Sequence, residues 1–193
     1  PEVSTNYVKN PIASNSTTDW TIAGGTSGGT LSVDTTAANI LFGRGVFKLT
    51  GTLVGAGRGP QVTLSAALPA ATTQVQVWSS GAAPTALPLG ATSKAPTTLR
   101  TEGGYTVYGA SFTSGEASGQ TTAQAGFAAG ALTVYVYIQV EQSSTYTTFV
   151  HGDAGPGYVW NGAAGQASST RYILDPDGQV VYGGSITAID DRV

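Results

Sequence analysis

One alternating stretch, residues 132–149, restricts the possible folds of this chain more than any other feature. From Leu132 to Val140 every second residue is aliphatic, and polar or aromatic residues lie between them. Successive side chains of a β-strand point to opposite faces of its sheet, so this spacing predicts a strand with one buried face. The other face carries Tyr135 and Tyr137, which are candidates for contact with a neighbouring subunit.

Shorter alternating segments recur along the 193 residues, with Gly and Pro between them. Two of them, residues 46–54 and 62–68, flank a Gly-rich turn and are predicted to pair as neighbouring antiparallel strands. Gly, Ala, Ser and Thr are abundant while Lys and Glu are scarce, which disfavours surface helices. Many short strands joined by turns predict an all-β fold, an antiparallel jelly-roll-like β-sandwich.

The turn signals also suggest how the chain is divided. We expect residues 1–6 to be a connector, residues 7–150 the sandwich, and residues 151–171 a Gly-rich segment packed on it. Residues 172–193 are predicted to form a C-terminal hairpin extension. The sequence Asp-Pro-Asp-Gly at residues 175–178 indicates its turn, because Pro presets φ and Gly tolerates positive φ.

Charge and composition exclude several classes of partner. Charged residues make up 10% of the chain and the net charge is -3, which argues against the basic surface that nucleic-acid binding requires. No apolar run approaches the ~20 residues that span a bilayer, so we expect no membrane insertion. The chain has no cysteine, so disulfides and thiolate metal sites are excluded.

One predicted strand carries side chains suited to carbohydrate. Val75 and Val77 point to the core, while Gln74, Gln76 and Trp78 share the opposite face. An indole ring stacks on the C–H face of a sugar, and amide groups pair with its hydroxyls. The alternative is that Trp78 ends the strand and packs under a loop, with the two glutamines solvated.

The residue types needed for hydrolysis are sparse. A hydrolase needs a nucleophile with a base, or two carboxylates at a defined separation. His151 is the only histidine, and Glu102, Glu116 and Glu141 are scattered along the chain. We therefore expect a protein that is not an enzyme.

Three segments together resemble a known family. They are NYVKNP at residues 6–11 followed by a polar run and Trp20, the strand that closes in Val140-Glu141, and FVHGDAGPGYVWNGAAGQASSTR at residues 149–171. In these segments the chain resembles minor tail proteins of actinobacterial phages, whose domains resemble jelly-roll carbohydrate-binding modules. The resemblance implies a virion protein with other virion proteins as partners, a homotrimer or ring, and a host cell-surface polysaccharide as ligand.

The family pattern also bears on metal binding. Where the family usually has Asp-Gly-Asp, this chain has His151-Gly152-Asp153, which removes one carboxylate; Ca²⁺ prefers 6–8 oxygen ligands. Asp153 matches the family, as does Trp160, and a structural role is implied for both.

Carboxylates near the two ends of the chain are candidates for a cation site. They are Glu2, Asp190 and Asp191, which could hold a structural Ca²⁺, as terminal carboxylates do in some modules that this chain resembles. The alternative is that all three are solvated charges, so the sequence predicts no required cofactor.

Three functions are consistent with these observations. The first is a non-enzymatic phage virion protein, a minor tail or tail-tip component that binds host glycans and is extracellular once assembled. The second is a purely structural decoration of a tail or capsid. The third is a carbohydrate-binding module of a secreted glycoside hydrolase.

Overall fold

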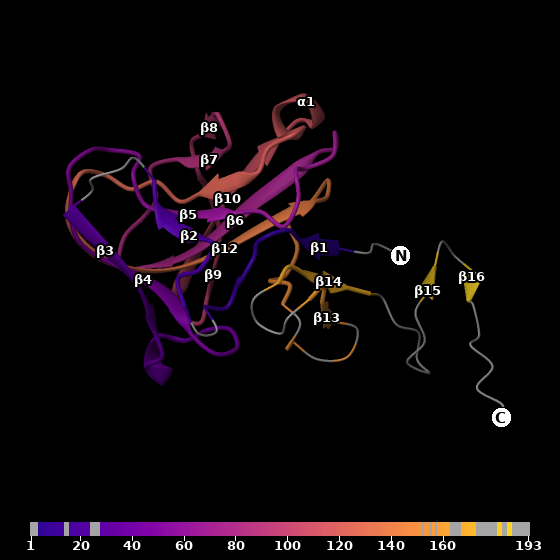
Figure 1. The fold of residues 1–193 in the computed structure, drawn as a ribbon, viewed down its shortest axis with the longest axis horizontal. Coiled ribbons are helices and arrows are strands. Elements are labelled where there is room, and N and C mark those ends of the chain that lie inside the picture. Colours follow the sequence, from indigo (N-terminus) through magenta and orange to yellow (C-terminus); the bar gives the residue numbers. More distant parts are fainter. Residues whose placement is uncertain are drawn as a thin grey trace.

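Two antiparallel sheets packed face to face form the body of the protein (Figure 1). The structure is a computed structural model that describes residues 4–13, 16–23, 28–151, 153–154, 156, 158–162, 167–172, 181–182 and 185–186. The predicted all-β, jelly-roll-like sandwich is confirmed. Within the part of the chain described here, no helix is long and apolar enough to cross a membrane.

The larger sheet has six strands with β12 and β6 at its centre. In spatial order the strands are β3 (Gly28–Asp34), β4 (Val46–Leu53), β12 (Gly130–Gln142), β6 (Thr73–Ser80), β10 (Tyr105–Phe112) and β9 (Thr97–Glu102). Every neighbouring pair is antiparallel. The strand predicted from residue 132 onward is therefore the long central strand of this sheet.

The smaller sheet has five strands. In spatial order they are β2 (Trp20–Ile22), β5 (Pro60–Thr63), β11 (Thr122–Gln124), β7 (Leu87–Leu89) and β8 (Thr92–Lys94). The prediction that residues 46–54 and 62–68 pair with each other is wrong, because β4 and β5 belong to different sheets. Their apolar side chains face the same core from opposite sides, so alternation identified the buried face of each strand but not its partner.

The core lies between the two sheets. Val134, Val136, Ile138 and Val140 of β12 are fully buried there, which confirms the predicted face. Full burial of such a side chain contributes roughly 1.5–3 kcal/mol. Trp20 closes the core by stacking on Phe47, with ring centroids 3.8 Å apart.

Short elements surround the sandwich. A three-stranded sheet contains, in spatial order, β1 (Ser4–Asn6), β14 (Ser169–Arg171) and β13 (Tyr158–Trp160). Directly after β1, the Tyr7 amide donates a hydrogen bond of 2.8 Å to the Val140 carbonyl of β12. The 3-10 helix η1 spans Ala37–Asn39, and the helix α1 spans Ser114–Ala117 with a capping box formed by Thr113 and Glu116.

The C-terminal extension is described only in part. β15 (Val181–Tyr182) pairs with β16 (Ser185–Ile186) as an antiparallel pair. The predicted turn at residues 175–178 lies outside the described residues. The hairpin predicted around that turn therefore stays a prediction.

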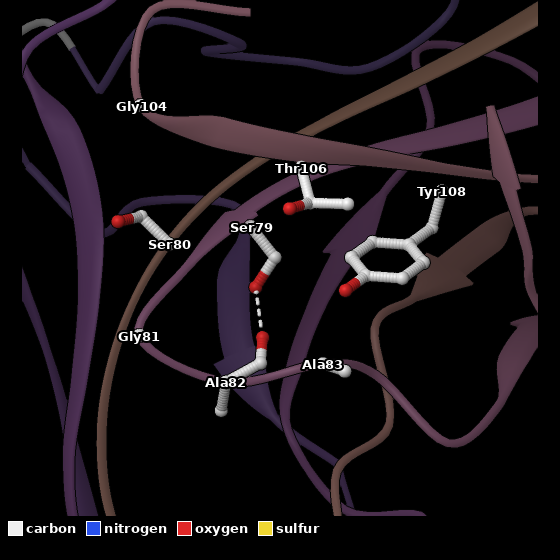
Figure 2. A pocket seen from close by; sticks show the side chains of 8 residues that line it. All are labelled: Ser79, Ser80, Gly81, Ala82, Ala83, Gly104, Thr106 and Tyr108. Atoms are coloured by element: carbon white, nitrogen blue, oxygen red, sulfur yellow. Dashed lines mark hydrogen bonds between the residues drawn. The ribbon is translucent and has the colours of Figure 1, made fainter. Parts of the chain in front are cut away.

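One end of the sandwich is hollowed where β6 ends and β10 begins (Figure 2). The loop that follows β6 and the turn that precedes β10 form its rim. The hollow has a volume of about 280 Å³.

Candidate functional site

The outer face of the six-stranded sheet, which is the face turned away from the five-stranded sheet, carries a second apolar cluster. Trp78 and Tyr137 lie at its centre and are fully buried. Phe42 and Phe149 stack on each other with ring centroids 4.3 Å apart, and they cover Trp78 at 5.6 and 5.0 Å. Residues 143–150, which we call the covering segment, thus bring an aromatic ring over the strand that was predicted to bind sugar.

The predicted sugar-binding residues are not exposed. Trp78 and Gln76 are 0% exposed and Gln74 is 2% exposed. The expectation of an open face is wrong, although the three side chains do share one face of β6. Alternation separates the two faces of a strand, but it does not reveal that a segment 70 or so residues later covers the second one. The alternative interpretation is right that Trp78 packs under a loop. It is wrong that Trp78 ends the strand, which continues to Ser80, and that the two glutamines are solvated, since both are buried.

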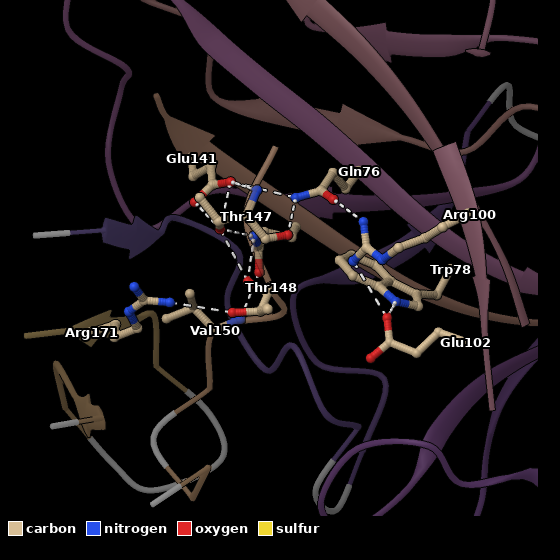
Figure 3. Close-up of polar contacts among 10 residues, drawn as sticks. Gln76, Trp78, Arg100, Glu102, Glu141, Thr147, Thr148, Val150 and Arg171 are labelled. Carbon is tan, nitrogen blue, oxygen red and sulfur yellow. Dashed lines mark hydrogen bonds and ion pairs between the residues drawn. The ribbon is translucent and has the colours of Figure 1, made fainter. Parts of the chain in front are cut away.

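A row of polar side chains holds the covering segment in place (Figure 3). The Gln76 side-chain amide donates to the Thr147 carbonyl at 3.1 Å and to a Glu141 carboxylate oxygen at 3.4 Å. Glu141 is fully buried and accepts from the Thr147 amide at 3.1 Å and its hydroxyl at 2.8 Å. Gln139 accepts from the Val150 amide at 2.6 Å. Buried polar groups in folded proteins are hydrogen-bonded, and these side chains find their partners in the covering segment. They therefore hold that segment against the sheet and are not available to a ligand.

The row reaches solvent at the edge strand β9. The Trp78 indole donates to a Glu102 carboxylate oxygen at 3.0 Å, and that oxygen also pairs with Arg100 at 3.3 Å (Figure 3). The Arg100 guanidinium lies 5.4 Å from the Trp78 ring centroid. The side chains of Arg100 and Glu102 are 36% and 38% exposed, so this pair offers donors and acceptors at the surface beside the covered tryptophan. Sequence reasoning missed both roles because neither residue stands out locally.

The two candidate interface tyrosines differ. Tyr137 is fully buried, and its hydroxyl accepts hydrogen bonds from the amides of Leu41 and Phe42 at 3.0 and 3.3 Å. Burial raises the pKa of Tyr137, and the two backbone hydrogen bonds oppose that effect. The prediction that Tyr137 contacts another subunit is therefore wrong. Tyr135 is half-buried beside the Lys48 ammonium, 5.7 Å from its ring, and remains a predicted contact.

Asp153 links two distant parts of the chain. It accepts from the Trp160 indole at 2.9 Å and from the Arg44 guanidinium at 2.9 Å. The Trp160 hydrogen bond, followed by the Arg44 charge, holds the pKa of Asp153 below its ordinary value. These contacts agree with the structural role that the resemblance implied for Asp153 and Trp160. Arg44, which was not predicted, is 109 residues away in sequence.

His151 lies under the same aromatic cover. It is 7% exposed, and its ring centroid is 6.1 Å from that of Phe42 and 5.8 Å from that of Phe149. Its Nδ1 atom has no hydrogen-bond partner among the described residues. Burial lowers the pKa of His151 below its ordinary value, while the nearby Asp153 carboxylate acts in the opposite direction.

We expect the protein to lose stability as the pH falls below about 6.5, because the unfolded chain then binds a proton at His151 that the native state resists. The contribution of neutral His151 to the free energy of unfolding is complete above the unfolded-state pKa. It is lost toward lower pH, by at most about 1.4 kcal/mol per pH unit. Urea unfolding at about pH 7.5 and about pH 5.5 measures this change in the free energy of unfolding. The variant His151→Gln should show a flatter profile between these values; an unchanged profile would assign the pH dependence to other groups.

The candidate cation ligands Glu2, Asp190 and Asp191 lie outside the described residues. Among the residues that the structure describes, no group of three or more His, Cys, Asp or Glu side chains is arranged to hold a metal ion. A structural Ca²⁺ at the chain ends therefore stays a prediction.

The fold has counterparts among solved structures. No protein-family model matches the chain, and no curated protein sequence matches it. The C-terminal family 22 carbohydrate-binding module of Clostridium thermocellum Xyn10B superposes with a TM-score of 0.51 at 14% identity, over 74% of this chain and 95% of that module. That module has been studied for the role of conserved cleft residues in ligand binding.

Two further structures are similar to a lesser degree. The CBM22-1 xylan-binding domain of Paenibacillus barcinonensis Xyn10C has a TM-score of 0.45 at 13% identity, over 75% of this chain and 97% of that domain. The enzymatically active domain of bacteriophage CBA120 tailspike protein 4 has a TM-score of 0.48 at 17% identity, over 70% of this chain. This chain spans 21% of the tailspike chain. The superposition on the Xyn10B module shows that the two proteins share a β-sandwich fold.

Proposed function

We propose that this protein is a non-enzymatic virion component of a phage tail, a minor tail or tail-tip protein whose sandwich binds glycans of the host cell surface. The observation that carries the proposal is the fold shared with the Xyn10B module, which covers 74% of this chain. The resemblance of residues 149–171 to minor tail proteins of actinobacterial phages supports the virion location. Other virion proteins and copies of this chain, in a trimer or ring, are the expected partners.

The state of the acidic residues supports a binding role over a catalytic one. Glu141 is buried and bound to Thr147, Glu102 is paired with Arg100, and Glu116 is paired with Lys94 at 2.7 Å. A pair of catalytic carboxylates must face a shared substrate position. Each of these three is instead committed to a local structural contact.

A glycan array probed with the intact protein tests the glycan-binding part of the proposal. We expect signal on a restricted set of polysaccharides, detected through multivalent display of the oligomer. The same preparation after heat unfolding is the control for non-specific adhesion. No signal from the intact protein on any glycan, host cell-wall polysaccharide included, would contradict glycan binding.

The second candidate is a purely structural decoration of a tail or capsid. It is favoured by the burial of Trp78 and Tyr137 inside a single chain, since the aromatic groups expected to bind a ligand or a neighbour stabilise the fold instead. A particle in which this chain contacts only other virion proteins, together with a negative array, would support it. Detection of the chain in purified phage particles by mass spectrometry separates both candidates from a module of a secreted glycoside hydrolase.

A further inference from the structure

We propose that the hollow at the end of the sandwich is a subsite for one neutral sugar unit, an inference that rests on the proposed glycan-binding function. The hollow is lined by the ends of β6 and β10 and by the loop after β6 (Figure 2). Its lining residues are Ser79, Ser80, Gly81, Ala82, Ala83, Gly104, Thr106 and Tyr108. At about 280 Å³ it lies at the lower end of the range for ligand pockets, which suits a single ring rather than a long chain.

The strand pattern changes from apolar to polar where the sandwich opens. Val77 and Ala110 face the core, and the next inward positions on the same two strands are Ser79 and Tyr108, followed by Thr106. Polar side chains at inward positions cost free energy when they are buried without hydrogen-bond partners. This end instead presents hydroxyl groups and one aromatic ring around an open space (Figure 2).

The lining has the chemistry that a sugar requires. The Tyr108 ring supplies an apolar surface for the C–H face of a pyranose. The hydroxyls of Tyr108 and Thr106 make no hydrogen bond with any residue that the structure describes, so each is free to donate to or accept from a sugar hydroxyl. No charged side chain lines the hollow. An anionic sugar would therefore lose its solvation without gaining a counter-charge, and a neutral one is favoured.

One hydrogen bond and one glycine fix the loop that forms the rim of the hollow. The Ser79 hydroxyl donates to the Ala82 carbonyl at 2.6 Å and fixes the loop (Figure 2). Gly81 has φ +101°, and a Cβ atom there would lie 2.4 Å from the Thr133 carbonyl oxygen, so the loop passes against β12 only as glycine. A fixed rim reduces the ordering cost of binding.

Three variants test the assignment. Thr106→Val and Tyr108→Phe each remove one hydroxyl while keeping the shape, and Ala83→Trp fills the mouth from an exposed loop position. Ala67→Trp, also at an exposed position but outside the hollow, is the matched control. Two measurements are made on each intact protein. In the first, neutral methyl glycosides are titrated into ¹⁵N-labelled protein and the amide resonances are followed by NMR. In the second, binding is measured on the glycan array.

We expect a neutral methyl glycoside to shift the amide resonances of Gly81 and Gly104. Each hydroxyl variant should weaken binding about fivefold, the effect of one hydrogen bond. Ala83→Trp should abolish the array signal while Ala67→Trp keeps it. Array signal retained by Ala83→Trp would overturn the subsite and leave the proposed function standing. No array signal from the unsubstituted protein would overturn the proposed function itself, and the subsite with it.

Discussion

Replacing Trp78 by alanine will lower the free energy of unfolding by about 3–5 kcal/mol, the range for removing a fully buried large aromatic side chain. Trp78 is 0% exposed and makes edge-on contacts with Phe42 and Phe149. The substitution leaves a cavity between the sheet and the covering segment, and it deprives Glu102 of the indole hydrogen bond. Urea unfolding followed by far-UV circular dichroism measures the loss.

The matched control is Val54→Ala at a side chain that is 64% exposed, where a change within about 0.5 kcal/mol is expected. The comparison also decides what Trp78 does. A Trp78→Ala protein as stable as the unsubstituted chain, but unable to bind glycan, would restore Trp78 as a ligand contact and contradict its assignment to the second apolar cluster.

The variant Gly51→Ala will destabilise the six-stranded sheet by about 3 kcal/mol or more, from backbone strain and a backbone collision together. Gly51 lies within β4 with φ +127°, a region that side-chain-bearing residues rarely adopt. A Cβ atom there would be 2.5 Å from the Gly28 carbonyl oxygen and 2.9 Å from the Gly29 Cα. Neither contact is relieved by a rotamer change, because both are with the backbone of β3.

Gly115→Ala is the control, since Gly115 is an exposed residue of the helix α1 and a Cβ atom there meets nothing within 4 Å. Alanine favours helix over glycine, so this variant should be neutral or slightly more stable. Thermal unfolding of both variants gives the comparison. Equal midpoints for Gly51→Ala and the unsubstituted protein would show that β3 and β4 separate at little cost.

Some features of the covering segment show where prediction from sequence stops. The sequence shows that Phe149 follows a strongly predicted strand. Its stacking partner Phe42 is more than a hundred residues away, and no pattern around Phe42 indicates that the two rings meet. The same holds for the Arg44–Asp153 ion pair. Contacts of this kind depend on which distant segments of the chain pack together. The periodicity of a single sequence reports local secondary structure and does not indicate those pairings.

The sequence by itself determined that Leu132 to Val140 forms a strand with one apolar face, that Val75 and Val77 point to the core, and that the fold is all-β. These follow from the two-residue repeat of extended backbone, which is a local property. Only the tertiary structure decided that β4 and β5 lie in different sheets and that Trp78 is covered while Tyr108 lines an open hollow. The physical reason is that burial of the second face of a strand depends on which distant segment packs against it.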